Sequence, residues 1–269
     1  RLAQELINDG HDTTLISFSL QYPNFLFPGK TQYATTPRPE GLRVMELINS
    51  INPLNWIRVG LKLRKMKADL ILVRFWLPFM GPSTGTVCRI AKSQKTKVIA
   101  ITDNIIPHEK RPGDMLFTRY FTSACDGFLA MSECVFQELD IFRKKKPKLL
   151  SPHPIYDHYG ALLSRDYALN KLQLEPNYRY ILFFGFIRDY KGLDILLEAY
   201  SQTKHKELNI KILVAGEYYS NEKKYTDLIE NLDLKEDVIL KTDYIPDNEV
   251  NLYFCASDLI AQPYKTATQ

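Results

Sequence analysis

Short apolar runs alternate with segments of helical periodicity over most of this chain. Residues 180–184 (Tyr-Ile-Leu-Phe-Phe) form an unbroken apolar run, which is typical of a strand covered on both faces, as in a parallel sheet. The same pattern predicts strands over residues 13–17, 70–73, 97–101, 127–131, 149–151, 208–215, 237–240 and 258–261. Helical spacing predicts helices over residues 1–8, 52–67, 115–123, 165–174, 193–200 and 221–232, one that begins at Ser132 and one that ends at Phe254. This alternation indicates an α/β fold with a parallel, doubly wound sheet.

The length of the chain, 269 residues, allows two domains of ordinary size. Pro152 and Pro154 mark a rigid connection, so we expect the boundary between residues 155 and 156. The four cysteines are widely scattered without a Cys-x-x-Cys pair. This spacing argues against a zinc site and a disulfide framework, and it is typical of a reducing cytoplasm. No apolar run has the length of a membrane span.

Two cations follow the strand predicted at residues 180–184. Gly185 ends that strand, Arg188 and Lys191 come next, and Gly192 opens a helix. A helix N-terminus attracts anions, and cations placed there cost stability unless an anion joins them. Because Arg offers phosphate oxygens a planar fork and Lys a point charge, the pattern indicates a diphosphate cradle at the carboxyl end of the sheet. The alternative is a solvated turn with two surface cations.

The stretch Gly-Phe-Ile-Arg-Asp-Tyr-Lys-Gly-Leu-Asp-Ile-Leu-Leu-Glu-Ala, which starts at Gly185, resembles the donor-binding motif of retaining nucleotide-sugar glycosyltransferases of the family 4 type. Those enzymes have the GT-B fold, in which two Rossmann-like domains face each other across a cleft. The resemblance implies an acceptor-side domain over residues 1–155 and a nucleotide-sugar-binding domain over residues 156–269. It also implies that Arg188 and Lys191 hold the diphosphate of the sugar donor.

The activity that the resemblance implies is transfer of a hexosyl group from a nucleoside-diphosphate sugar to a hydroxyl of a saccharide or lipid-linked acceptor. The expected setting is the synthesis of a cell-surface polysaccharide or glycolipid. Arg188 and Lys191 would stabilise the charge that develops on the leaving diphosphate. In the retaining mechanism that diphosphate can itself take the acceptor proton. No carboxylates cluster with metal-ligand spacing, so we expect a metal-independent site without a cofactor.

The sequence departs from the family pattern near both ends. The family has a strand and a Gly-rich loop before its first helix, whereas this sequence opens on the helix at residues 1–8, so we expect the sequence to lack its start. The family also has a pair of glutamates near the ribose and sugar of the donor. The first would fall near Ala267, which cannot replace it, and the second beyond Gln269. The alternative function is therefore a non-catalytic nucleotide-sugar-binding or partner subunit on the same fold.

Further candidate residues follow the strand at residues 97–101. Asp103, Asn104, His108 and Glu109 stand where α/β proteins bind ligands. His108 beside Glu109 is the candidate acid/base or sugar-hydroxyl ligand of the first domain. In the resembled enzymes a histidine of this region contacts the transferred sugar, often at the position of Asp103. The alternative is an exposed loop histidine.

Gly216 and Glu217 end the strand predicted at residues 208–215, and Gly216 can approach the nucleotide there. The alternative is that the pair only forms a turn. An epimerase or a phosphorylase on the same architecture is a third hypothesis. A phosphorylase would need a lysine in a context suited to pyridoxal phosphate, which the sequence does not show.

The charge of the chain is a mild positive excess, with a net charge of +4 and a pI near 8.7. It is compatible with an anionic substrate or membrane, and too weak to argue for nucleic acid. The helix at residues 52–67 is basic and amphipathic, so it either lies on an anionic membrane or packs by its apolar side with its charges in water. The aromatic-rich loop at residues 21–41 either helps to recognise an acceptor or is a surface loop. The expected location is the cytoplasm, with peripheral contact to the inner face of the cell membrane as a hypothesis.

Overall fold

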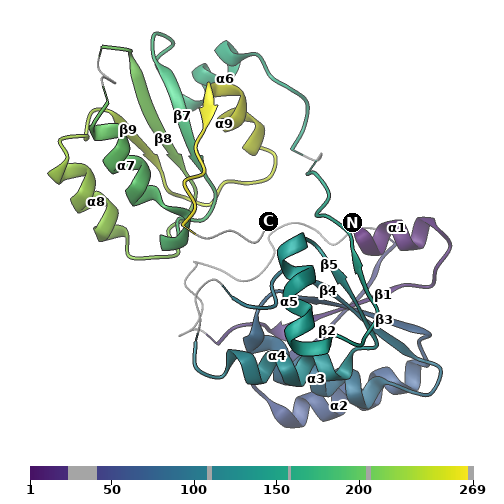
Figure 1. Ribbon diagram of the computed structural model, residues 1–269. Coiled ribbons are helices and arrows are strands. Elements are labelled where there is room, and N and C mark those ends of the chain that lie inside the picture. The colour runs from purple at the N-terminus through teal and green to yellow at the C-terminus, as the bar shows by residue number, and fades with distance from the viewer. Residues whose placement is uncertain (24–40, 108–110, 157–158, 204–206, 266–269) are drawn as a thin grey trace. The chain divides into compact units, whose positions relative to one another are not determined.

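The computed structural model describes residues 1–23, 41–107, 111–156, 159–203 and 207–265. The chain divides into two compact units, a first unit that covers Arg1–His153 and a second unit that covers Pro154–Ala267 (Figure 1). The expected boundary stood after residue 155. The expected loop at residues 21–41 lies mostly outside the described residues.

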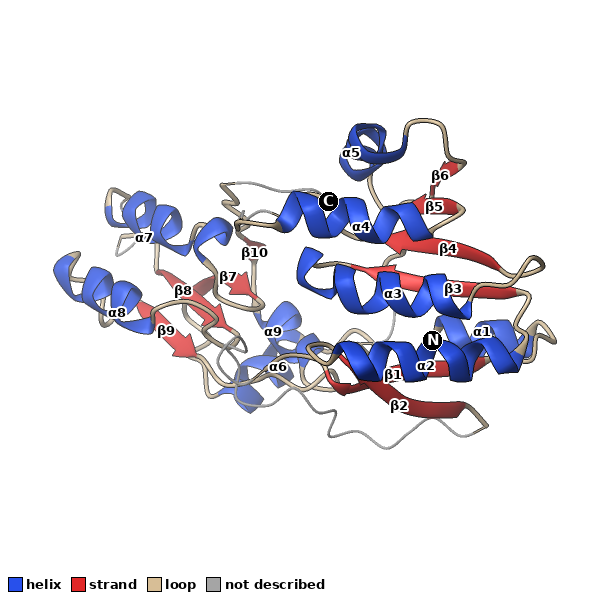
Figure 2. Ribbon diagram, turned by 90° about the horizontal axis from the view of Figure 1, so that it is seen from below, coloured by secondary structure: helices blue, strands red, loops and turns tan. Residues whose placement is uncertain are grey.

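The first unit is a Rossmann-like α/β unit. Its sheets are β3-β4-β5-β6 and β1-β2, and every neighbouring pair of strands is parallel. Helices α2, α3 and α4 lie side by side in one layer, with α3 in the middle (Figure 2). In chain order its elements are α1 (Leu2–Asn8), β1 (Thr14–Leu20), β2 (Arg43–Asn49), α2 (Pro53–Met66), β3 (Leu70–Phe75), η2 (Pro78–Met80), α3 (Gly81–Ala91), β4 (Lys97–Thr102), α4 (Asp114–Ala124), β5 (Gly127–Ala130), α5 (Glu133–Arg143) and β6 (Lys148–Leu150).

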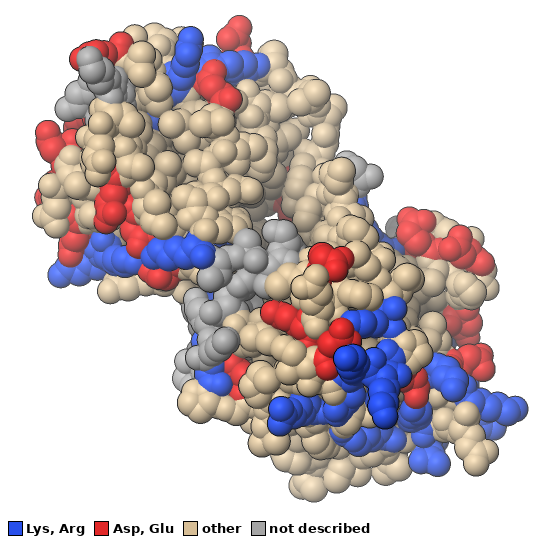
Figure 3. Space-filling model, in the orientation of Figure 1, with Lys and Arg blue, Asp and Glu red and all other residues tan. Residues whose placement is uncertain are grey.

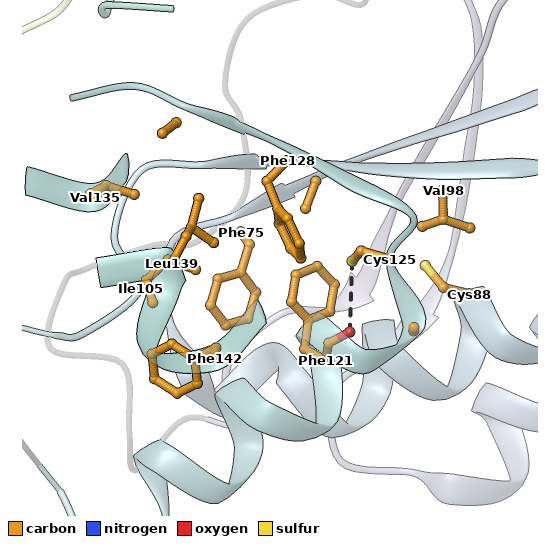
Figure 4. Close-up of a cluster of buried hydrophobic side chains, with 13 residues drawn as sticks. Phe75, Cys88, Val98, Ile105, Phe121, Cys125, Phe128, Val135, Leu139 and Phe142 are labelled. Atoms are coloured by element: carbon orange, nitrogen blue, oxygen red, sulfur yellow. Dashed lines mark hydrogen bonds between the residues drawn. The ribbon is translucent and has the colours of Figure 1, made fainter. Parts of the chain in front are cut away.

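The main core of the first unit lies between its longer sheet and the helices α4 and α5 (Figure 4). Phe75 of β3 stacks on Phe121 of α4, with 4.3 Å between the ring centres and 5° between the ring planes. Cys125 Sγ donates a hydrogen bond to Phe121 O at 3.6 Å, so this thiol is buried as part of the packing. Burial of large aromatic side chains is the main source of stability in such a core.

The second unit is also Rossmann-like, with a single sheet in the order β10-β7-β8-β9 and parallel pairing throughout. Apolar side chains fill both faces of this sheet. Phe183 of β7 packs towards α7 and α8, and Leu182 packs towards α6 and α9. Its elements are α6 (Arg165–Leu172), β7 (Arg179–Phe184), η3 (Asp189–Lys191), α7 (Leu193–Ser201), β8 (Ile210–Ala215), α8 (Glu222–Asn231), β9 (Val238–Lys241), α9 (Val250–Ala256) and β10 (Leu259–Ile260).

The predicted fold class is confirmed, because parallel strands alternate with helices in both units. Every strand and helix named from the sequence has a counterpart within a few residues of its expected ends. Strand β2, helix α3 and the short 3-10 turns η2 and η3 were not predicted. The turn η3 lies between Arg188 and Gly192, within the strand-to-helix turn that the sequence placed before the helix. Within the described residues, no helix combines the length and hydrophobicity that crossing a bilayer requires.

Candidate functional site

Two glycines end the neighbouring strands β7 and β8. Gly185 leaves β7 with a φ of +95°, and its N–H donates to Ala215 O at 2.8 Å. Gly216 follows β8, and its N–H donates to Lys241 O at 2.9 Å. A Cβ at position 216 would lie 2.4 Å from Gly185 O, so any side chain there would collide with the backbone. The two strand ends can lie this close together because Gly216 has no side chain.

Beyond these glycines the two chain segments stay paired. Ile187 N–H donates to Glu217 O at 2.9 Å, and Tyr219 N–H donates to Ile187 O at 3.0 Å. Ile187 is completely buried, and Glu217 is 8% exposed. This pairing fixes the backbone immediately before Arg188 and places Glu217 beside Ile187.

Among the described residues, Arg188 and Lys191 have aromatic neighbours and no carboxylate partner. Arg188 immediately precedes η3 and Lys191 ends it, and both side chains are half-buried. The guanidinium carbon of Arg188 lies 5.2 Å from the centre of the Tyr219 ring, and Lys191 Nζ lies 5.8 Å from the centre of the Tyr264 ring. In the part of the chain that the structure describes, neither cation forms an ion pair. An aromatic face attracts a cation but does not neutralise it, so both charges remain uncompensated.

The electrostatics of Lys191 follow from its position. A Cβ at position 185 would lie 2.9 Å from Lys191 Nζ, so the ammonium group stands next to the end of β7. Burial lowers the pKa of Lys191, and the positive charge of Arg188 lowers it further. Helix α7 begins after Gly192, which has no side chain to cap the first N–H groups. Two uncompensated cations beside the positive end of a helix form an arrangement that an anion would stabilise.

The acidic residues of this turn are neutralised by other cations. Asp189 and Asp194 both form ion pairs with Lys224 of α8 and with Lys265, which follows β10. Lys265 Nζ lies 2.7 Å from Asp194 and 3.1 Å from Asp189. Hydrogen bonds from Lys224 and Lys265 hold the pKa of Asp189 below its usual range. We call these four residues the turn network. It ties η3 and α7 to α8 and to the segment after β10.

The candidate residues of the first unit follow β4. The Asp103 carboxylate accepts two hydrogen bonds from the Arg74 guanidinium, at 2.7 Å from Nε and 2.9 Å from Nη2. Asp103 is buried, and its N–H donates to Phe75 O at 3.0 Å. Asn104 is half-buried beside it. The Asp103 charge is thus already compensated by Arg74, a partner that sequence analysis missed.

The structure therefore brings five predicted residues together in the second unit. These are Gly185, Arg188, Lys191, Gly216 and Glu217. His108, Glu109 and Ala267 lie outside the described residues. The turn network and the rings of Tyr219 and Tyr264 were not predicted. Asp189 and Asp194 stand inside the recognised motif, but their lysine partners come from distant parts of the sequence.

A family model described as glycosyl transferases group 1 matches residues 164–267, which is most of the second unit. None of the curated proteins compared with the chain matches it.

Several solved structures resemble the whole chain or most of it. Sucrose-phosphate synthase from Thermosynechococcus elongatus has a TM-score of 0.73 at 12% identity, and the match covers 100% of this chain and 69% of that one. Anabaena HepE in complex with UDP and glucose has a TM-score of 0.64 at 14% identity, over 83% of this chain and 60% of that one. WaaG, a glycosyltransferase involved in lipopolysaccharide biosynthesis, has a TM-score of 0.63 at 14% identity, over 98% of this chain and 69% of that one. At such identities the likeness establishes a shared fold.

Proposed function

We propose that this protein transfers a sugar from a nucleoside-diphosphate sugar to an acceptor hydroxyl. The observation that carries the proposal is the pair Arg188 and Lys191, half-buried and without an ion-pair partner among the described residues, at the carboxyl end of a parallel sheet. Ligands of open α/β sheets bind at that end. The family match over residues 164–267 supports sugar transfer, and the complex of HepE with UDP and glucose supports a nucleotide-sugar donor.

The chemistry follows from where charge develops. When the bond between the sugar carbon and the diphosphate oxygen breaks, negative charge grows on the departing diphosphate. Arg188 and Lys191 are held in place before the reaction, so they stabilise that charge without reorganising. The acceptor oxygen forms the new bond to the same sugar carbon, and its proton passes to the leaving diphosphate. This route retains the configuration of the sugar and requires no separate base.

The finer features of the proposal extend the resemblance to family 4 enzymes. Gly216 and Glu217 approach the nucleotide. In the acceptor-side domain, Asp103, Asn104 and Glu109 bind substrate, and His108 is the acid/base or sugar-hydroxyl ligand. The donor would carry a hexosyl group, and the acceptor would be a saccharide or a lipid-linked saccharide of the cell surface. We place the protein in the cytoplasm with peripheral contact to an anionic membrane. Metal independence is part of the proposal, so activity should survive a chelator such as EDTA.

A second candidate is a subunit that binds nucleotide sugars without transferring them. The feature that favours it is Ala267, which stands where the resembled motif has its first glutamate. Such a subunit would bind a nucleoside diphosphate and leave the sugar of a nucleotide sugar uncleaved.

The double variant Arg188→Ala/Lys191→Ala should lose sugar release and diphosphate affinity together. Hydrogen bonds to charged groups contribute about 1.5–3 kcal/mol each, so we expect a loss of UDP or GDP affinity of at least about 100-fold. Calorimetric titration with both diphosphates measures the affinity, and release of labelled sugar from a donor panel measures activity. The control is Lys171→Ala/Lys223→Ala, which removes the same charge from exposed positions of the second unit. If the first double variant binds both diphosphates as well as the parent does, the proposed cradle is wrong. If the parent protein binds the diphosphates but releases no sugar, it is the non-catalytic subunit of the second candidate function.

The variant Gly185→Ala should weaken UDP binding while the protein stays folded. The new Cβ would lie 2.9 Å from Lys191 Nζ, so the flexible lysine has to move away from the end of β7. We expect about a tenfold or larger loss of affinity, because the displaced group makes a charge-assisted contact. Gly10→Ala is the matched control, since Gly10 has a φ of +86° and open space at its Cβ position. Equal affinities for Gly185→Ala and the parent would contradict the role of Lys191.

A further inference from the structure

Helix α2 has apolar side chains on two opposite faces. Its inward face packs Val59, with Trp56 and Leu63 beside it, into a small core with Ile48 and Val87. These contacts provide the burial that an amphipathic helix needs in order to dock on its own unit. The predicted packing of this helix by an apolar side is therefore present, but it accounts for only part of the apolar residues of α2.

The outward face of α2 exposes three further large apolar residues. Leu54 is 66% exposed, Ile57 44% and Leu61 50%. Their spacing of three and four residues places them in one stripe along the helix. Leu61 lies two positions from both Val59 and Leu63, and so it points to the side of the helix opposite to them.

The start of α2 is fixed to the end of β2, so this stripe is held rigidly. Asn55 Oδ1 accepts from Asn49 N–H at 2.8 Å, and Asn55 Nδ2 donates to Leu47 O at 3.0 Å. Trp56 Nε1 donates to Asn49 O at 2.6 Å, and Asn52 caps the helix through its side chain. The exposure of the stripe is thus a property of an ordered helix.

The charges on the outward side of α2 all have one sign. Arg58, Lys62, Arg64 and Lys65 are exposed, and the helix contains no acidic residue. Within the described part of the chain none of the four cations takes part in an ion pair. Arg58 lies three residues before Leu61 and Lys65 lies four residues after it, so both cations stand on the same side of the helix as Leu61. Lys62 lies four residues after Arg58.

Helix α4 lies in the same layer as α2, on the other side of α3 (Figure 2), and it also carries exposed apolar side chains. Leu116 is 67% exposed and Tyr120 is 39% exposed, and Arg119 lies between them. The layer of α2, α3 and α4 contains six cations and, in Asp114, one acidic residue. In Figure 3, Lys and Arg side chains also gather on the first unit over α3 and α5.

We propose that the outward face of α2 docks on a lipid bilayer that carries anionic headgroups. The cations complement the headgroups, while Leu54, Ile57 and Leu61 enter the boundary between headgroups and acyl chains. A second copy of this chain is a poor occupant, because the charged residues of α2 are all cations and two such faces repel each other. The inference specifies the surface for the proposed membrane contact and does not depend on sugar transfer.

The test is sedimentation of the whole chain with lipid vesicles. The parent should bind vesicles of phosphatidylcholine with phosphatidylglycerol and leave vesicles of phosphatidylcholine alone unbound, with binding that weakens as salt increases. Each cation near an anionic surface contributes roughly fivefold to binding, so Arg58→Gln/Lys62→Gln/Lys65→Gln should reduce it by at least about tenfold. Leu54→Ser/Ile57→Ser/Leu61→Ser should lose the binding that remains at high salt.

The matched control is Lys171→Gln/Arg179→Gln/Lys223→Gln, which changes the net charge equally at exposed positions of the second unit. It should bind anionic vesicles within about twofold of the parent. An equal loss in both charge variants, or no binding by the parent, would overturn the proposal. A parent dimer that the Leu54→Ser/Ile57→Ser/Leu61→Ser variant converts to a monomer in analytical ultracentrifugation would also overturn it, because the occupant would then be a second copy. Titration of UDP on the same variants should show unchanged affinity, which separates this result from failure of the proposed donor site.

Discussion

Replacing Lys191 with methionine is expected to abolish most of the UDP affinity and to raise the thermal stability of the unliganded protein. The ammonium group is half-buried beside Arg188 without an ion-pair partner among the described residues. A charge-assisted hydrogen bond contributes about 1.5–3 kcal/mol, so affinity should fall roughly 10- to 150-fold. Removing the uncompensated charge should raise Tm by about 2 °C or more. Calorimetric titration and a thermal melt measure the two effects.

The gain in stability should depend on pH. Burial and Arg188 place the pKa of Lys191 in the folded protein below the unfolded value of 10.5. The folded protein then holds fewer protons than the unfolded chain in the range between the two values, so the parent becomes more stable as pH rises through that range. The advantage of the methionine variant should be complete at neutral pH and shrink as pH approaches 10.5. The control is Lys223→Met, an exposed change on α8. It should leave the UDP affinity unchanged, and its stability should rise with pH as that of the parent does. A methionine variant at position 191 that is less stable than the parent at neutral pH would refute the argument.

Replacing Gly192 with alanine is expected to be the most destabilising of these changes. Gly192 has a φ of +74°, and a Cβ there would lie 2.0 Å from Pro263 O. Two backbone segments, one before α7 and one after β10, would have to separate to admit a single methyl group. We expect a loss of at least about 3 kcal/mol in the free energy of unfolding, from backbone strain and from the displaced contact together. Urea denaturation followed by circular dichroism measures it.

Gly10→Ala again serves as the control for this change. Its φ of +86° imposes a similar backbone strain, but no atom lies within 4 Å of the added Cβ. The control should therefore lose only the conformational part, about 1–2 kcal/mol. If both variants lost the same free energy, the close approach of Pro263 to Gly192 would contribute nothing to stability.

The fold class could be predicted because both faces of the second sheet are covered. The run at residues 180–184 is apolar at every position, and the structure buries Leu182 on one face and Phe183 on the other. The limits of α2 were predictable from local chemistry, since Asn52 caps it and Lys67 ends it in the left-handed conformation.

Helix α3 and strand β2 were not predictable in the same way. Helix α3 begins Gly-Pro-Ser-Thr-Gly-Thr, a composition with low intrinsic helix propensity. Its small residues allow close packing, and a Cβ at Gly81 would lie 2.5 Å from Phe117 O. Tertiary contact, and not intrinsic propensity, therefore determines that this segment forms a helix. Strand β2 includes Arg43, Glu46 and Asn49, and it is mostly half-exposed or exposed, so it shows no unbroken apolar run.

The cluster of predicted site residues in the second unit follows from topology. Because β7 and β8 are parallel neighbours, the residues that follow them must meet at one edge of the sheet. Their roles in binding remain predictions. The compensation of charge could not be read from the sequence, which shows Asp189 and Asp194 beside Arg188 and Lys191. The structure pairs both aspartates with Lys224 and Lys265, which lie far from them in the sequence.

The turn network also has a consequence for the order in which the second unit matures during synthesis. Asp189 and Lys265 are 76 residues apart in sequence, and Lys265 N–H donates to Tyr190 O at 2.8 Å. The ribosome therefore makes Arg188 and Lys191 long before it makes the segment that fixes their turn. Contacts of such separation form late, after the costly closure of a long loop. On the proposed function, we therefore expect a nucleotide to stabilise this unit only after β10 has joined β7, in the finished domain and not in the growing chain.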